Sequence, residues 1–342
     1  MNPGESVTLL FTLVLGAWIL GLTVRLYLRT KPVRFNDPTP LPSTPVSETS
    51  FRILTVGGIG GEILALRWVG RYMLALKPAL LTLFPNSQVR NHQPGMRLTS
   101  RLAAEYLACE ILSSAEKETE AVAPLILIGH SKGGIDILEL MIQHPALIGR
   151  IRLAVIMNTP LSGSWVADLL VDRVLKPLRL KWPALEELTT ESRKRFWSER
   201  WSALPEWHRR LILKRLHIVT SEEFHSAQCA WPIILSHRWM RLSGLRSDGL
   251  VALENQKFPM IPNTAIAQPV TTHFFWHHGF LTCRAMLSNI TDIERQETLR
   301  TIFAQHLVLL REPRLAPDAK PTRHKMAHLA SRRRYGHLEV IK

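Results

Sequence analysis

The feature that most constrains the fold is the run of residues 129–134, which has the sequence GHSKGG. An apolar run, residues 124–128, directly precedes it, and residues 135–142 follow it with apolar side chains at helical spacing. A short apolar run bounded by Pro and Gly is typical of a buried strand, and the spacing after it predicts a helix. Ser131 is therefore expected on a tight turn between a strand and a helix.

This setting suggests a chemical role for the serine. The pattern G-x-S-x-G between a strand and a helix is that of a nucleophile elbow, a strained turn that lifts the serine hydroxyl above the edge of the sheet. Gly129 and Gly133 suit their positions, because side chains there would collide with the neighbouring strand and helix. The pattern itself occurs by chance in many proteins, so its position between strand and helix is what makes it informative.

Length and composition set the broad class of the chain. The chain has 342 residues, 46% of them hydrophobic, which excludes global disorder and permits a large core. A formal net charge of +15 indicates a basic surface suited to nucleic acid, anionic lipid or acidic ligands. The three cysteines (Cys109, Cys229 and Cys283) lie far apart, which predicts neither a zinc site nor a disulfide framework. We expect no metal and no cofactor.

The N-terminal segment is apolar. Residues 7–24 carry no charge and would form a helix about 27 Å long, just enough to cross a bilayer. We interpret residues 1–30 as a transmembrane anchor and the proline-rich residues 31–50 as a linker. A cleaved signal peptide and a buried core helix are the alternatives. Basic residues follow the span and favour a cytoplasmic location for the rest of the chain: Arg25, Arg29, Lys31 and Arg34.

Alternating strands and helices run through the middle of the chain. The first strand, residues 51–56, leads into GGIGG at residues 57–61. A dinucleotide-binding turn would need glycine at position 63, where Ile63 stands. Such alternation predicts a parallel sheet covered on both faces. The other predicted strands are 80–84, 124–128, 151–157, 216–220 and 269–276, and the predicted helices are 62–77, 98–115, 135–142 and 291–310.

Three motifs together resemble the lipase and esterase branch of the α/β-hydrolase family. They are GGIGG, GHSKGG and the sequence NTPLSGS at residues 158–164, and the resemblance extends over residues 51–310. It implies a mostly parallel sheet flanked by helices, with a helical cap at about residues 165–213. It further implies a serine hydrolase that cleaves an acyl ester, with a lipid ester as the favoured substrate, through an acyl-enzyme on Ser131. The backbone N–H groups of Ile59, or a neighbouring glycine, and Lys132 would form the oxyanion hole.

An acid to orient the catalytic histidine is expected after a later strand. Residues 246–251 are similar to the S-D-G-x-V turn of lipase-like proteins, which makes Asp248 the candidate. Asp-Gly is also a common tight turn without chemistry. Asp136 and Asp168 are weaker candidates, since one lies on the helix after the elbow and the other in the cap.

The catalytic base is expected near the end of the last predicted strand. His273, His277 and His278 all lie there. Residues 276–281 resemble the D-H-x-x-L pattern of related proteins, which favours His278 as the base with His277 next. The chain order Ser131, Asp248, His278 is that of an α/β-hydrolase.

Two basic regions follow the elbow. Residues 172–215 contain twelve Lys and Arg against six Asp and Glu, and the tail, residues 311–342, contains nine against three. We expect the tail to be disordered and to favour anionic lipid, since no nucleic-acid reader fold is visible. The tryptophans of the cap either meet a lipid interface or pack on the core: Trp182, Trp197, Trp201 and Trp207.

Other functions fit the same motifs. An acyltransferase or a thioesterase would use the same triad and acyl-enzyme. A catalytically degenerate hydrolase could serve as a membrane-bound interaction module. The expected partners are thus a lipid or other acyl-ester substrate and a membrane, contacted by the N-terminal helix, the basic cap and the tail.

Overall fold

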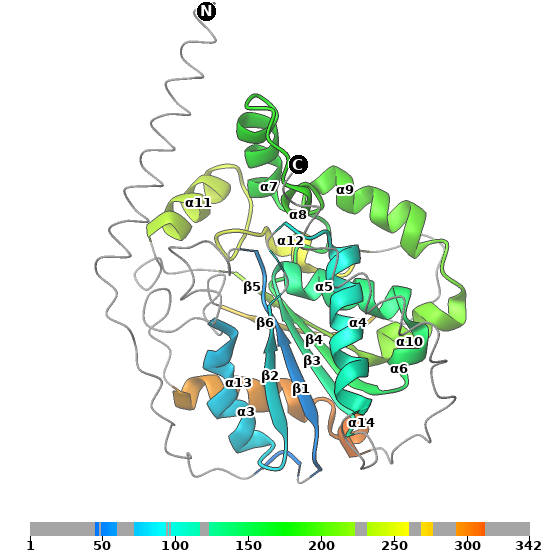
Figure 1. Cartoon of the computed structure of the whole chain (residues 1–342). Coiled ribbons are helices and arrows are strands. Elements are labelled where there is room, and N and C mark those ends of the chain that lie inside the picture. Colours follow the sequence, from blue (N-terminus) through cyan, green and yellow to red (C-terminus); the bar gives the residue numbers. More distant parts are fainter. Residues whose placement is uncertain are drawn as a thin grey trace, which may run out of the picture.

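The computed structural model of the chain contains a six-stranded sheet with helices on both faces (Figure 1). Every strand pairs in parallel with its neighbours, in the order β2-β1-β3-β4-β5-β6. The strands are β1 (Arg52–Val56), β2 (Gln88–His92), β3 (Leu125–His130), β4 (Ile151–Met157), β5 (Leu216–Ser221) and β6 (Val270–Phe274). The structure describes residues 45–47, 49–59, 72–93, 95, 97–116, 123–222, 231–259, 268–275 and 292–311.

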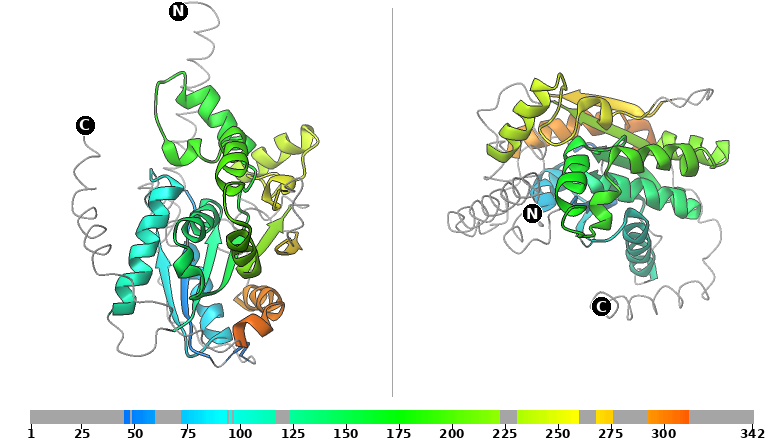
Figure 2. Two further views of the ribbon diagram at one scale, coloured as in Figure 1. Left: turned by 90° about the vertical axis from the view of Figure 1, so that its right-hand side faces the viewer. Right: turned by 90° about the horizontal axis from the view of Figure 1, so that it is seen from above.

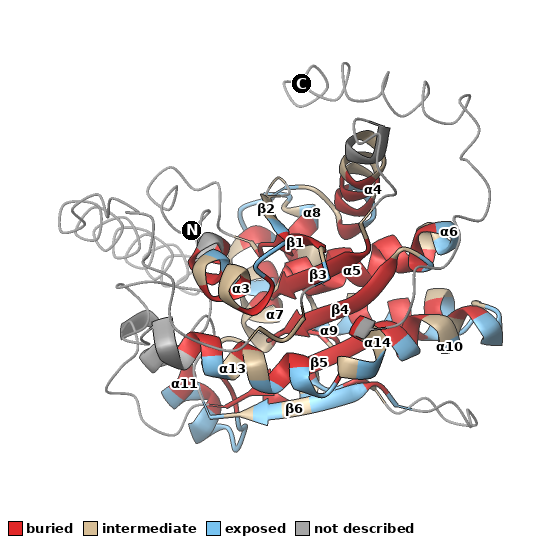
Figure 3. Ribbon diagram, turned by 90° about the horizontal axis from the view of Figure 1, so that it is seen from below, coloured by how far each residue is buried: buried red, intermediate tan, exposed pale blue. Residues whose placement is uncertain are grey.

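The central strands are buried on both faces, and the two edge strands are not. Every residue of β3 and β4 is buried, whereas β2 and β6 contain exposed residues (Figure 3). Continuous apolar runs such as ILTV in β1 and LILI in β3 form these central strands, because helices cover both of their faces.

Alternate residues of the strands face two separate cores. On one face, Ile126 and Ile128 of β3 pack with η2, α3, α13 and α14. On the other face, Leu125 and Leu127 pack with α4, α5, α6 and α10. The bounds of these helices are η2 (Tyr72–Leu76), α3 (Lys77–Leu83), α4 (Ser100–Glu116), α5 (Lys132–Gln143), α6 (Pro145–Ile148), α10 (Glu206–Arg215), α13 (Asp292–Ala304) and α14 (Leu307–Arg311).

The remaining helices gather at one end of the sheet (Figures 1 and 2). Those between β4 and β5 belong to the predicted cap, and those between β5 and β6 belong to the long connection before the last strand. They are α7 (Trp165–Leu170), η3 (Val171–Leu175), α8 (Pro183–Glu186), α9 (Thr190–Arg195), η4 (Phe196–Trp201), α11 (Trp231–Leu242) and α12 (Leu253–Gln256).

Most strand predictions are confirmed, one predicted strand is wrong, and one observed strand was not predicted. Residues 80–84, predicted as a strand, belong to or follow helix α3, because Pro78 begins this helix instead of ending one. The strand β2 was not predicted, since its sequence QVRNH is mostly polar and lies at the sheet edge. The predicted helix 291–310 is divided into α13 and α14, with His306 in the turn between them.

Several predictions fall on residues that the structure does not describe. These are the anchor at 1–30, most of the linker at 31–50, most of the helix at 62–77 and the tail from residue 312. Among the described residues, the structure contains no helix with the length and hydropathy needed to cross a bilayer. The anchor and the tail therefore stay predictions.

Candidate active site

Ser131 occupies a strained turn between β3 and α5. Its backbone has φ 56° and ψ −127°, a conformation that residues with a side chain seldom adopt. The Ser131 N–H donates a hydrogen bond to the Met157 carbonyl at 2.9 Å, which fixes the turn beside the end of β4. The side chain is half-buried. The local geometry is that of the predicted elbow.

The glycines around Ser131 are required by close backbone packing. A Cβ atom at Gly129 would lie 2.7 Å from the Gly133 carbonyl oxygen, and one at Gly133 would lie 2.2 Å from that of Val56. The predicted collisions with helix and strand are thus confirmed. At Gly134 the close neighbour is a side chain, because a Cβ atom there would lie 2.0 Å from Thr159 Oγ1.

The loop after β1 passes directly beside the serine. A Cβ atom at Gly58 would lie 2.8 Å from Ser131 Cβ and 3.2 Å from its Oγ. Only glycine therefore lets this backbone approach the hydroxyl. Ile59, the predicted oxyanion donor, follows in the same loop, and Gly60 and Gly61 lie outside the described residues.

Asp248 is fully buried in the short loop that follows α11. Its Oδ1 accepts hydrogen bonds from the N–H groups of Leu250 at 2.9 Å and Val251 at 2.8 Å. Gly249, directly after Asp248, has φ 100°, so the predicted Asp-Gly turn depends on glycine. These hydrogen bonds thus stabilise the loop and hold the Asp248 carboxylate in one orientation.

Asn158 connects this acid to the elbow. Its Nδ2 donates to Asp248 Oδ2 at 2.8 Å and to the hydroxyl of Ser221, the last residue of β5. Asn158 directly follows Met157, the residue that accepts the Ser131 N–H. The structure therefore brings Ser131 and Asp248 to neighbouring strand ends. No role of this asparagine was predicted from the sequence, although it is the first residue of the NTPLSGS motif.

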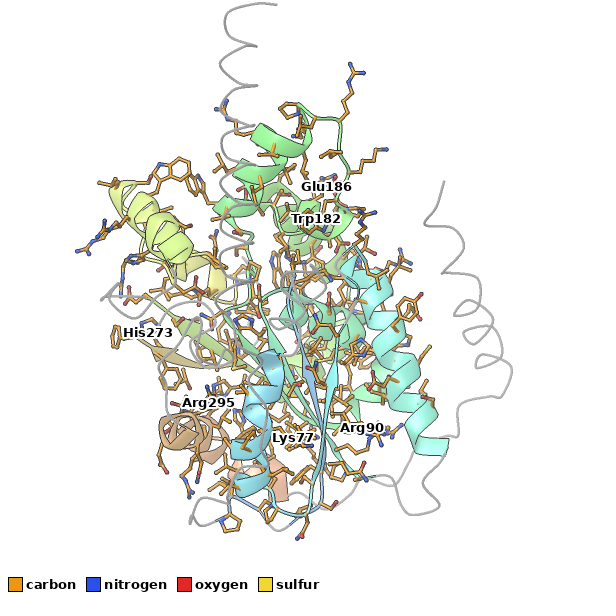
Figure 4. The ribbon with its side chains drawn as sticks, turned by 60° about the vertical axis from the view of Figure 1, so that its left-hand side comes forward. Lys77, Arg90, Trp182, Glu186, His273 and Arg295 are labelled. Carbon is orange, nitrogen blue, oxygen red and sulfur yellow. The ribbon has the colours of Figure 1, made fainter. Side chains whose placement is uncertain are left out.

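The predicted bases, His278 and His277, lie outside the described residues. His273 lies within them, on the edge strand β6 (Figure 4). Its Nδ1 and Thr220 Oγ1 are 3.0 Å apart, and its Nε2 lies 3.2 Å from Glu222 Oε1. Arg246 also pairs with this carboxylate, and together with His273 it lowers the pKa of Glu222. His273 is thus engaged with Thr220 and Glu222.

Neither weaker acid candidate occupies the position of Asp248. Asp168 accepts hydrogen bonds from the N–H of Thr190 at 2.8 Å and from its hydroxyl at 2.9 Å, which joins α7 to α9. Asp136 instead lies on α5 and pairs with Lys132, whose Nζ is 2.6 Å from Asp136 Oδ1. Both carboxylates therefore have structural contacts.

The Lys132–Asp136 ion pair lies at the start of the elbow helix. Its two side chains are 2% and 1% exposed. Burial raises the pKa of Asp136 to about 6, against the opposing effect of the Lys132 ammonium. Only the backbone N–H of Lys132 has a role predicted from the sequence, so the buried charge of its side chain is an additional finding.

The predicted cap has two parts with different packing. Trp197 and Trp201 lie in the main core, 8% and 1% exposed, and Trp197 Nε1 donates to the Leu161 carbonyl at 2.7 Å. For these two tryptophans the structure favours packing over an interface. Trp207 on α10 is exposed, and Trp182 packs partly buried in the other part of the cap, beside Glu186 (Figure 4).

The second part of the cap forms an apolar cluster that packs against the elbow helix α5. Ile135, from the first turns of α5, packs in it, and Ile59, from the glycine-rich loop, packs against it. The cluster thus connects the two segments that carry the predicted oxyanion donors. The cap contributes Ala167, Val171, Leu175, Leu185 and Leu188.

Two cavities open near this end of the described structure. One, of about 500 Å³, lies between β5, β6 and α12 and has Thr220, Phe258 and His273 in its wall. The other, of about 780 Å³, lies within the cap between η3 and α9. Ser131 lines neither of them.

No protein-family model and no curated protein matches the chain. Several solved structures, however, are similar to the chain in fold. The mature lipase BlEst2 from Bacillus licheniformis is 18% identical, with a TM-score of 0.54 over 79% of this chain and 96% of that one. The chain has the α/β-hydrolase fold. Phospholipase PlaB from Legionella pneumophila in complex with thio-NAD, at 12% identity, gives a TM-score of 0.51 over 82% of this chain and 61% of that one.

In an α/β-hydrolase the nucleophile, the acid and the histidine follow one another along the chain. Ser131 follows β3 and Asp248 follows β5, so the two predicted residues come in this order, and their catalytic roles stay predictions. The parallel sheet and its flanking helices confirm the fold expected from the sequence motifs.

Proposed function

We propose that the protein is a serine hydrolase that cleaves the acyl ester of a lipid. The observation that carries this proposal is the left-handed backbone of Ser131, against which the Gly58 backbone packs. A strained residue persists only where the surrounding structure holds it, and such residues gather at functional sites. Here the strain presents a hydroxyl beside a glycine-rich loop.

The proposed mechanism assigns one role to each residue. His278 takes the proton of Ser131 as the hydroxyl attacks the ester carbonyl, and Asp248 holds the imidazole in the required tautomer. The N–H groups of Ile59 and Lys132 bind the oxyanion. His278 gives the proton to the leaving alcohol, and a water then releases the acyl group from Ser131.

The position of β6 supports a base from the residues that follow this strand. Phe274, its last residue, pairs with Ser221, whose hydroxyl accepts a hydrogen bond from Asn158. His278 comes four residues later in the sequence. His278 is therefore close in sequence to the strand end near which Asp248 is held.

The substrate class is inferred from the apolar cluster of the cap. Ile59 packs against this cluster, so an acyl chain bound at the oxyanion loop would meet aliphatic side chains. The lipase BlEst2 and phospholipase PlaB share the fold and, by their names, act on lipids. Both points favour a lipid ester over a small soluble ester.

Labelling with a fluorophosphonate probe tests the nucleophile. We expect the wild-type chain and the Ser162→Ala control to be labelled and Ser131→Ala to remain unlabelled. Equal labelling of Ser131→Ala, or none of the wild type, would contradict the proposal. Hydrolysis of esters with different chain lengths and headgroups then tests the substrate class, and a preference for short soluble esters would argue against a lipid.

We also propose that residues 1–30 anchor the chain in a membrane with the hydrolase domain on the cytoplasmic side. The uncharged run at 7–24 and the basic residues after it support this. Carbonate extraction should leave the chain in the membrane pellet. Protease added to intact cells should leave the domain uncut, and cleavage there would reverse the orientation.

A further inference from the structure

Two exposed segments at one end of the molecule share the same chemistry. The first, residues 176–181, has the sequence KPLRLK, and the second, residues 238–246, has the sequence RWMRLSGLR. Neither contains an acidic residue, and each contains three basic ones. The first segment lies in the cap after η3, and the second spans the end of α11 and the turn after it.

Large apolar side chains of both segments are exposed to solvent. Leu180 is 55% exposed in the cap segment, and Leu242 is 87% exposed at the end of α11. Leu178, Trp239 and Leu245 are also exposed. Exposing several large apolar side chains together is unfavourable in water, so their grouping indicates a surface that is covered in use.

The two segments belong to one end of the fold. The ring centroids of Trp165, at the start of α7, and Trp239, on α11, are 4.3 Å apart, and the two rings make an edge-to-face contact. The cap and α11 therefore touch. Figures 1 and 2 show both at the same end of the sheet, the end at which β3 leads into α5.

A basic side chain is kept at the cap turn although glycine would fit better there. Arg179 has φ 54°, in the left-handed region that disfavours residues with a Cβ atom. Lys176 in the same turn pairs with Asp172 at 2.6 Å, and both side chains remain largely exposed. The strained turn thus presents a cation among exposed leucines.

We propose that this surface, residues 176–181 and 238–246, docks on a bilayer that contains anionic phospholipid. Leucine and tryptophan would enter the region of the headgroups and upper acyl chains, while arginine and lysine pair with phosphates. Nucleic acid would leave the leucines uncovered. An acidic protein would need a complementary apolar partner surface, whereas a fluid bilayer accommodates apolar side chains that protrude singly.

The docking surface goes beyond the proposed hydrolase function. It needs no catalytic residue, so Ser131→Ala should dock as the wild type does. Its position would place the elbow and the cap cluster next to the lipid. Loss of docking and loss of the nucleophile can therefore be measured separately.

Hydrogen–deuterium exchange of the full-length chain tests the proposal. The chain is reconstituted with vesicles of phosphatidylcholine alone or of phosphatidylcholine with phosphatidylglycerol, so that an N-terminal anchor contributes equally to both. We expect slower exchange at residues 176–181 and 238–246 with the anionic vesicles only. High salt should weaken this protection, and peptides around Trp207, which is also exposed, should not change.

Charge insertion on the surface provides the matched variants. Leu180→Glu and Leu242→Glu should each lose the protection specific to anionic vesicles. Val308→Glu, at an 80% exposed position on α14 in the opposite part of the fold, should keep it. Equal exchange in both vesicle types would overturn the proposal. Protection that grows with protein concentration without lipid would also overturn it, in favour of a second copy as the occupant.

Discussion

The side-chain amide of Asn158 donates a hydrogen bond to Asp248 Oδ2 at 2.8 Å. Both residues are buried, and 90 positions of sequence separate them. The contact joins the end of β4 to the loop after α11. It therefore holds the proposed acid next to the strand end that also supports the elbow.

Replacing Asn158 tests this support. We expect Asn158→Ala to lower the free energy of unfolding by about 1–3 kcal/mol, because Asp248 and Ser221 lose their donor in a buried site, and to lower kcat/KM. Asn158→Gly removes the same side chain and tolerates the φ of 50° at this position. It should be the more stable of the two in urea unfolding. If Asn158→Ala is as active as wild type, the asparagine does not position the acid.

The strain at Ser131 predicts a trade between stability and activity. Ser131→Gly should be more stable than wild type by about 1–3 kcal/mol, because glycine adopts the left-handed conformation without a Cβ clash. Ser131→Ala keeps the Cβ atom and should gain little. Both should be inactive toward esters. Chemical denaturation of the three proteins measures the difference, and equal stability of the glycine and alanine variants would show that the turn is not strained.

Gly58 and Gly149 form a matched pair of substitutions. An added Cβ at Gly58 meets Ser131, whereas one at Gly149 meets nothing within 4 Å. Gly58→Ala should therefore lower kcat/KM by at least about tenfold, since the oxyanion loop must move away from the hydroxyl. Gly149→Ala should keep full activity with a stability within about 1 kcal/mol of wild type. Ester hydrolysis at several substrate concentrations checks both, and unchanged kinetics in Gly58→Ala would place the reacting groups elsewhere.

The buried Lys132–Asp136 pair predicts a pH-dependent loss of stability. Lys132→Met leaves a buried carboxylate without its cation and should lower the free energy of unfolding by about 3–5 kcal/mol near neutral pH. Burial raises the pKa of Asp136, so the folded state binds its proton more tightly than the unfolded state. Without the Lys132 ammonium, which lowers it, this pKa rises further, so the variant should regain stability as the pH falls from neutral towards about 4.

The double variant Lys132→Met/Asp136→Leu serves as the control for that loss. It removes both charges and should recover much of the stability at neutral pH. Thermal unfolding of wild type, single and double variants at several pH values provides the comparison. A double variant as unstable as the single one would mean that packing, and not the unpaired charge, causes the loss.

A buried histidine pair predicts acid sensitivity. His217 Nδ1 and His306 Nε2 lie 2.5 Å apart, and both side chains are buried. Burial, and then His306, lowers the pKa of His217 to about 3, and burial lowers that of His306. Below about pH 6.5 the unfolded chain binds protons that the folded protein does not, so stability falls by up to about 1.4 kcal/mol per pH unit for each histidine.

The variant His306→Gln checks this pH dependence. It removes one of the two titrating groups, so its free energy of unfolding should fall less steeply between about pH 6.5 and pH 4. Urea unfolding at a series of pH values measures the slope. A slope equal to that of the wild type would show that His306 does not couple folding to protonation.

Much of the architecture could be predicted from local sequence. Buried parallel strands require continuous apolar runs, so residues 151–157 were assigned correctly from pattern alone. The edge strand β2 escaped prediction because one of its sides is not buried and its residues are polar. The predicted helix 62–77 stops just before Pro78, but proline also suits the first turn of a helix, and here it lies at the start of α3.

The residues that can form the elbow and the Asp-Gly turn are evident in the sequence, because glycine at fixed positions is a local steric requirement. Which side chains support these turns depends on how the chain packs in three dimensions. Asn158, Lys132 and Asp136 acquire their contacts through burial and through strands that are distant in sequence. Likewise, Trp197 and Trp201 lie in the core, whereas Leu180 and Leu242 lie on the surface. The sheet beneath a basic helical segment decides which side of the segment faces the core. A local sequence pattern does not show this.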